Sequence, residues 1–162
     1  MAEPEGWSGA TKIIAAVVVG MYIVLSGIFG NHLQSQLRWE SLIVAAGSGN
    51  VNVVRNLLDS GANPHADTVE GKTAMRSAID SAHEPDANYV RIVGLFIDHG
   101  ADVNQALRVA IDNDKPAIVQ LVISKGADVN QRYPDGGTPL SDAKRDNCVE
   151  IIKLLKKAGA RK

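Results

Sequence analysis

Aromatic residues, cysteine and net charge are all scarce in this sequence. Aromatic residues make up 4% of the 162 residues, which argues against a surface on which nucleic-acid bases stack. The formal net charge of −1 gives no general attraction for a phosphate backbone, so we expect no nucleic-acid partner. The lone cysteine, Cys148, cannot form a disulfide within the chain. No histidine lies near it in sequence, so we interpret it as a structural thiol rather than a nucleophile.

Motifs of catalysis and metal binding are also missing. The chain has no glycine-rich phosphate loop, no His-Glu-x-x-His and no Cys-x-x-Cys. Its histidines are widely spaced, at positions 32, 65, 83 and 99. Asp102 and Asp128 fall in predicted turns, where an aspartate accepts hydrogen bonds from backbone amides. We therefore expect neither an enzyme nor a bound metal or cofactor.

The stretch 125–140 shows the pattern from which most of the chain is built. It reads KGADVNQRYPDGGTPL. Gly126 follows an apolar helical run, where a left-handed residue is common. The Pro-Asp-Gly-Gly sequence at 134–137 predicts a tight turn. Thr138 and Pro139 then predict the N-cap and the first residue of a new helix.

This pattern recurs. The apolar residue that opens each predicted first helix occurs at intervals of 33, 32 and 33 residues, at Leu42, Met75, Leu107 and Leu140. Each is followed by a stripe of apolar residues, spaced i, i+1, i+4 and i+5 in units one and three, that predicts an amphipathic second helix. A single helix pair leaves apolar surface uncovered, so the pairs are expected to stack. We predict four units, starting near 38, 72, 105 and 138.

Two irregularities interrupt the repeat. Ala78 to Phe96 spans 18 residues where the matching interval in the other units spans 12, so six extra residues around 83–88 are expected between the helices of unit two. Gly100 to Leu107 spans 7 residues where Gly126 to Leu140 spans 14. The hairpin between units two and three is therefore predicted to be missing.

The sequence resembles the ankyrin repeat family, in Gly-Ala-Asp-Val-Asn followed by Asp-Gly-Gly-Thr-Pro-Leu. The resemblance covers about residues 38–162. It implies an all-α fold, an ankyrin-repeat solenoid of about four helix-pair units. It also implies a module that binds proteins, without catalysis, through its hairpin fingers and the concave face of its first helices.

The resemblance places the candidate partner-binding residues on the two fingers, on the concave helices and in the notch left by the missing finger. They are Asp67, Glu70, Asp80, Arg108, Asp112, Arg132, Tyr133, Asp135 and Arg145. Tyrosine and arginine are enriched at binding hot spots, so Arg132 and Tyr133 of the last finger are the preferred anchors. Replacing both by alanine is expected to abolish partner capture without lowering the melting temperature. The insertion at 83–88 is the alternative contact.

The segment Ile13–Phe29 carries no charged residue and approaches the roughly 20 residues that span a bilayer. We predict a short polar tail (1–11), an uncleaved transmembrane signal anchor (12–30), a tether (31–37) and the repeat domain (38–162). A buried soluble helix and a cleaved signal peptide are the alternatives. Small residues four apart within the segment would permit a membrane-helix partner.

The predicted topology depends on one charge. Lys12 precedes the apolar segment, and no Lys or Arg occurs over 31–37. The positive-inside rule then places the repeats outside the cytoplasm, in the periplasm at the inner membrane if the chain is bacterial. The leading functional interpretation is a single-pass, membrane-anchored adaptor or scaffold that holds a partner protein near the bilayer. An immunity-type inhibitor of a toxin or enzyme and an accessory subunit of a membrane complex are the alternatives.

Overall fold

The computed structural model describes residues 41–65, 73–83 and 87–161. The chain divides into two parts, Met1–Leu37 and Arg38–Lys162. The second part contains the four helix-pair units and is described below. The predicted tail, anchor helix and tether lie outside the described residues, as do Asp67 and Glu70 of the first finger. Of the helices that are described, none has the length and apolar character needed to cross a bilayer.

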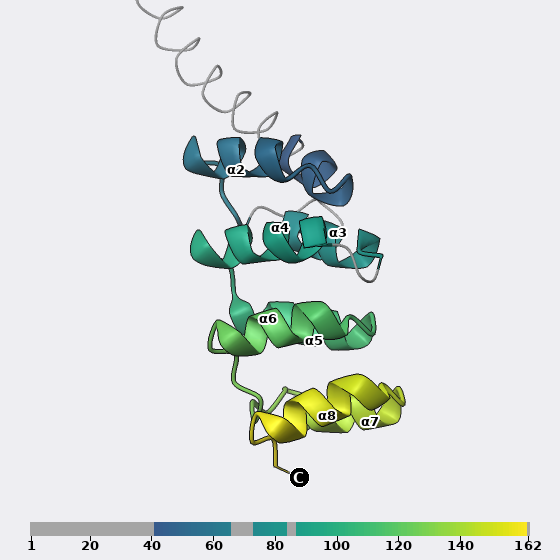
Figure 1. Cartoon of the computed structure of the whole chain (residues 1–162). Coiled ribbons are helices and arrows are strands. Elements are labelled where there is room, and N and C mark those ends of the chain that lie inside the picture. The colour runs from purple at the N-terminus through teal and green to yellow at the C-terminus, as the bar shows by residue number, and fades with distance from the viewer. Residues whose placement is uncertain (1–40, 66–72, 84–86, 162) are drawn as a thin grey trace, which may run out of the picture. The chain divides into compact units, whose positions relative to one another are not determined.

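The described residues form helix pairs stacked in chain order (Figure 1). Residues 41–47 are helical and pair with α2 (Val51–Asp59). The following pairs are α3 (Ala74–Ser81) with α4 (Ala87–Asp98), α5 (Val103–Asp112) with α6 (Pro116–Ser124), and α7 (Pro139–Arg145) with α8 (Val149–Lys157). The predicted all-helical repeat fold is confirmed in this part of the chain.

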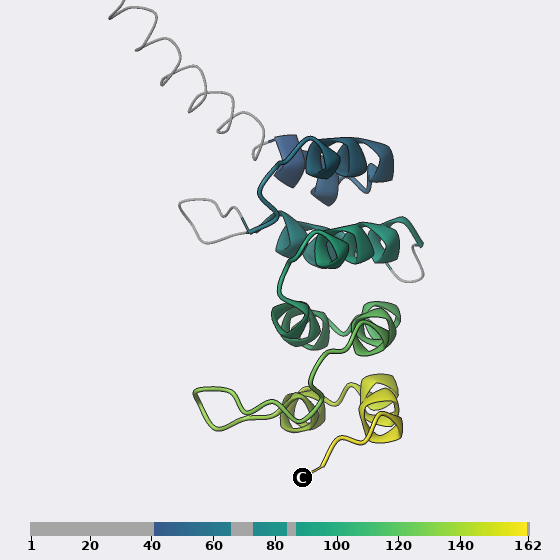
Figure 2. The same cartoon turned by 90° about the vertical axis from the view of Figure 1, so that its left-hand side faces the viewer.

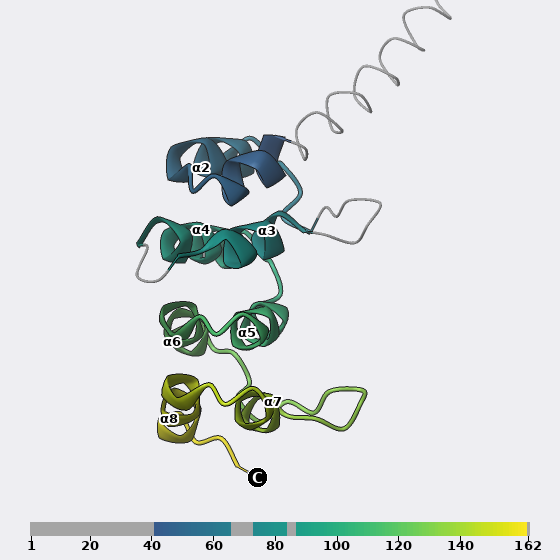
Figure 3. The same cartoon turned by 90° about the vertical axis from the view of Figure 1, so that its right-hand side faces the viewer.

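The helices lie in two layers, an inner layer with α3, α5 and α7 and an outer layer with α2, α4, α6 and α8 (Figures 2 and 3). Along the inner layer α5 contacts both α3 and α7, and along the outer layer α6 contacts both α4 and α8. Each unit therefore packs on its immediate neighbours, as the stacking argument predicts.

The residues of the repeating pattern form the core. Leu42, Met75, Leu107 and Leu140 are each at most 3% exposed. One alanine per first helix has no exposed surface at all: Ala46, Ala78, Ala110 and Ala143. Alanine at these positions lets adjacent helices approach closely, and the larger buried side chains, such as Phe96 and Ile118, fill the space between the layers.

Local sequence signals set the helix ends. Gly126 has a φ of 91°, and the glycines at 61, 100 and 159 also have positive φ. Thr138 caps α7 by accepting a hydrogen bond from the backbone N–H of Ser141, whose hydroxyl accepts one from the backbone N–H of Thr138. Pro139 is the first residue of the helix. These positions confirm the helix stop and start that the sequence predicts at 125–140.

The two irregularities have structural counterparts. Only four residues separate α4 from α5, so no finger joins units two and three. The six extra residues of unit two do not all lie in a loop. Between Ala78 and Phe96, compared with Ala110 to Val122 in unit three, three of them lie in α4, two in the connection and one in α3 after its buried alanine. The expectation of an insertion lying wholly between the helices over 83–88 is thus corrected, because 87 and 88 belong to α4; residues 84–86 are outside the described residues.

The lengthened start of α4 makes a contact with the first unit. Tyr89 is 8% exposed, and its hydroxyl donates a hydrogen bond to the backbone oxygen of Gly47, 3.1 Å away. Gly47 ends the helical segment 41–47, where backbone oxygens lack partners within the helix. The insertion therefore supplies a hydrogen bond that joins units one and two.

Two glycines provide a matched test of this fold. No atom lies within 4 Å of a Cβ built on Gly126, so Gly126→Val should destabilise through its positive φ alone, by more than about 1 kcal/mol. A Cβ on Gly94, inside α4, would lie 3.8 Å from Leu121 Cδ2, an ordinary contact. Gly94→Ala should therefore stabilise by about 0.5–1 kcal/mol. Thermal melts of the full-length variants measure both, and equal melting of Gly126→Val and wild type would contradict the assignment.

Candidate partner-binding surface

The finger between α6 and α7 is an ordered hairpin that projects on the side of the inner layer (Figure 3). The backbone N–H of Tyr133 donates to Gly137 O, and the N–H of Gly136 donates to Tyr133 O, each at 2.9 Å. Gly136 has a φ of 83°, as expected for a type I turn followed by a glycine bulge. The Asp135 carboxylate accepts the N–H of Gly137 at 3.0 Å. The predicted tight turn is confirmed, and its conformation is fixed before any partner binds.

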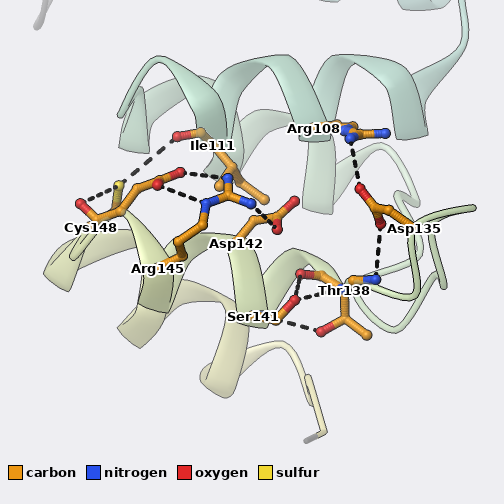
Figure 4. A network of polar contacts seen from close by, with 10 residues as sticks. Arg108, Ile111, Asp135, Thr138, Ser141, Asp142, Arg145 and Cys148 are labelled. Atoms are coloured by element: carbon orange, nitrogen blue, oxygen red, sulfur yellow. Dashed lines mark hydrogen bonds and ion pairs between the residues drawn. The ribbon is translucent and has the colours of Figure 1, made fainter.

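Tyr133 is not an exposed anchor. It is 6% exposed, and the Arg108 guanidinium lies over its ring, 4.5 Å from the centroid. Arg108 also forms an ion pair with Asp135, with 3.4 Å between Nη2 and Oδ2 (Figure 4). Arg108 comes from α5, so this contact fastens the finger to unit three. The prediction of Tyr133 as a preferred anchor for a partner is therefore corrected, because a side chain from the preceding unit covers its ring.

The hydroxyl of Tyr133 is the one buried side-chain oxygen or nitrogen without a hydrogen-bond partner in the described part of the chain. Burial, together with the nearby Asp142 carboxylate, raises the pKa of Tyr133 to about 12. A buried hydroxyl without a partner costs stability. The tyrosine is thus held by its ring rather than by its polar end.

Arg145 is engaged within its own unit. Its guanidinium makes two hydrogen bonds to Asp146, at 3.0 and 2.9 Å, and a third to Asp142 Oδ1 at 2.9 Å (Figure 4). The hydrogen bonds from Arg145 lower the pKa of Asp146, and the two carboxylates raise the pKa of Arg145. The Asp142 side chain is only 8% exposed, so Arg145 supplies the counter-charge for a buried carboxylate.

Asp112 differs from these aspartates. It is exposed at the C-terminal end of α5, and its carboxylate makes no hydrogen bond or ion pair with any described residue. Partial burial raises its pKa, the Arg108 charge lowers it, and the Asp142 charge raises it further, with a net upward shift. Asp112 is therefore a partly desolvated carboxylate without a direct counter-ion.

Five of the predicted residues thus come together: Arg108, Asp112, Tyr133, Asp135 and Arg145. With Asp142 and Asp146 they form what we call the acidic cluster. It contains four aspartates and two arginines, which gives a formal charge of −2. Asp142 was not predicted as a site residue, and its i, i+3 spacing to Arg145 is the signal that could have marked it. Asp146 follows Arg145 on the face that the family resemblance indicates for partner binding.

The other predicted residues lie elsewhere. Asp80 is on α3, where it pairs with Arg76 at 3.8 Å and accepts a hydrogen bond from Asn113 at 3.2 Å. Arg132 is exposed on the finger next to Tyr133. Asp67 and Glu70 lie outside the described residues.

No catalytic or metal centre stands out. Among the described residues no three His, Cys, Asp or Glu side chains are grouped so as to hold a metal ion. Cys148 is 5% exposed beneath the backbone of α5, with its Sγ 3.9 Å from Ile111 O. Burial raises the pKa of its thiol to about 11, so at neutral pH it is protonated and unreactive.

Stacked helix pairs, a hairpin finger and a charged cluster on the inner layer define a repeat protein of the protein-binding class. A profile described as "Ankyrin repeats (3 copies)" matches residues 13–106 and 82–162. The chain belongs to the ankyrin repeat family, whose members generally mediate protein–protein interactions and are typically non-catalytic. The comparison with curated proteins gave no match.

The environment of Tyr133 predicts that two substitutions change the stability of the fold in opposite directions. Tyr133→Phe removes an unpaired buried hydroxyl and keeps the ring beneath Arg108, so it should melt at or above the wild-type temperature. Tyr133→Ala removes the ring and should cost about 2–4 kcal/mol. Thermal melts of the full-length protein compare the two. A clear loss of stability in Tyr133→Phe would mean that the hydroxyl has a partner.

Proposed function

We propose that this protein is a membrane-anchored adaptor that binds a partner protein through the acidic cluster. The observation that carries this proposal is Asp112, a carboxylate that is partly desolvated and has no direct counter-ion. It lies beside a finger whose conformation is already fixed, so little ordering entropy is lost on docking. A partly desolvated carboxylate without a counter-ion has a lower free energy when a partner supplies a cation than it has in the free protein.

The charge of the cluster indicates the chemistry of the partner. Arg108 pairs with Asp135, and Arg145 is shared by Asp142 and Asp146. Of the net charge of −2, one unit therefore remains on the Asp142–Asp146 pair and one on Asp112, which is the aspartate of the cluster without a direct counter-ion. A lysine or arginine side chain of the partner would form a charge-assisted hydrogen bond with this carboxylate. We infer that the adaptor recognises a basic segment.

The raised pKa of Asp112 gives the direction of its effect on stability. Because the folded-state pKa lies above the unfolded one, the ionised carboxylate destabilises the folded state at neutral pH. This penalty disappears as the pH falls through the folded-state pKa. Removing the Asp112 charge should therefore leave the free energy of unfolding unchanged or raise it. A cation supplied by a partner would relieve the same penalty when the partner binds.

The adaptor proposal is tested by crosslinking capture from membranes with full-length protein. Asp112→Asn should weaken capture about tenfold or more, since a charged hydrogen bond is worth about 1.5–3 kcal/mol, and should melt no lower than wild type. Glu150→Gln, which removes one exposed charge from α8 outside the cluster, is the matched control and should capture normally. Equal capture by wild type and Asp112→Asn would refute the site. Loss of capture when Ile13–Phe29 is replaced by an unrelated apolar helix would favour an accessory subunit instead.

The membrane anchor is proposed from the uncharged segment Ile13–Phe29, and the orientation from Lys12. In a bacterial host, the protein with an exported phosphatase fused after Lys162 should sediment with membranes, resist carbonate extraction and show phosphatase activity. Carbonate-extractable protein would argue against the anchor. An inactive fusion, with a cytoplasmic reporter active at the same position, would reverse the orientation.

A further inference from the structure

The outer layer carries a groove that the proposed function does not use. It is lined by residues of α2, α4 and α6 and has a volume of about 590 Å³. These outer-layer helices lie on the side of the array away from the finger (Figure 3). The apolar lining of the groove is formed by Val51, Val90, Gly94, Leu95 and Leu121. Gly94 leaves room at the floor of the groove, because it lacks a side chain at a point where a Cβ would meet only Leu121.

Cations line the edges of this groove. Arg55 on α2, Arg91 on α4 and Lys125 after α6 come from three successive units, and Asp98 is the one anionic residue of the lining. The formal charge of the lining is therefore +2, in a protein whose net charge is −1. Asp98 is already paired with Lys125, 2.5 Å away. This leaves the positive charge on the two arginines.

Arg55 and Arg91 are exposed, and neither forms a hydrogen bond or ion pair with a residue of the described structure. A guanidinium binds a carboxylate in a planar, two-point geometry. The guanidinium groups of Arg55 and Arg91 lie on neighbouring helices beside the apolar floor of the groove. This arrangement suits an extended peptide segment with carboxylates at its edges and an apolar side chain between them.

We propose that this groove binds an acidic peptide segment of a protein partner, with carboxylates on Arg55 and Arg91 and an apolar side chain over Gly94. The chemistry is opposite to that of the acidic cluster, which suits a basic segment. The two surfaces lie on opposite layers, so occupation of one leaves the other accessible. The protein can then hold two segments of opposite charge at once.

Fluorescence anisotropy tests the groove with the full-length protein in a non-ionic detergent at low salt. The probe is a labelled peptide of sequence Glu-Glu-Leu-Leu-Glu-Glu, and the matched neutral peptide carries glutamine in place of glutamate. The glutamate peptide should bind at least tenfold more tightly than the glutamine peptide. Its binding should weaken steeply as salt is added, because the edge contacts are exposed.

The decisive variant is Arg55→Gln with Arg91→Gln, which should weaken binding of the glutamate peptide about tenfold, since two exposed ion pairs are lost. The matched control, Lys153→Gln with Lys156→Gln, removes the same charge from the exposed face of α8 and should change binding less than twofold. Because the capture assay for the acidic cluster uses Asp112→Asn, failure here leaves that proposal standing, and the reverse also holds.

Several outcomes would contradict the proposal that the groove binds an acidic peptide. Equal weakening by the arginine and lysine pairs would mean a diffuse charge effect. Equal binding of the two peptides, or no binding by wild type, would show that carboxylates are not recognised. Complete displacement of the peptide by millimolar inorganic phosphate would indicate a site for a single anion. Self-association that the arginine pair abolishes, without peptide binding, would assign the groove to a second copy of the chain.

Discussion

The structure depends on the apolar faces that each helix pair leaves uncovered and that only the next pair can cover. The buried alanine in each first helix, such as Ala78 or Ala110, keeps adjacent pairs close enough for this contact. Because the largest fully buried side chains, such as Phe96 and Ile118, fill the space within and between the units, the core has no room for a central site. The chemistry of the protein is therefore confined to its edges: the finger, the inner layer and the outer layer.

Signals contained in a few adjacent residues could be predicted from the sequence. The positive φ of Gly126, the capping of α7 by Thr138 and the missing finger all follow from local residue order or from spacing. The burial of Tyr133 could not be predicted in this way, since the side chain that covers it, Arg108, comes from the preceding unit. The spacing of the repeat gave the number of inserted residues in unit two. It did not predict that half of them would lengthen α4.

In the candidate site too, the location of residues could be predicted from the sequence, whereas their contacts could not. The family pattern placed Asp112 and Arg145 on one face of the array, and the structure brings them close together. It also shows that they act differently, because Arg145 is paired with Asp142 and Asp146 whereas Asp112 is not. Net charge was uninformative for a physical reason: the formal charges of the acidic cluster, −2, and of the groove lining, +2, cancel in the sum.

The hydrogen bond from Tyr89 to Gly47 has a consequence for how the chain could be rearranged. In a regular repeat array each unit can be exchanged for another, because all interfaces share one pattern. Here the first interface includes a contact that only the lengthened α4 can reach, so unit two is matched to unit one. Transplanting a standard repeat into this position would leave the end of the first helix without that partner. Unit two is therefore not freely exchangeable for a standard repeat.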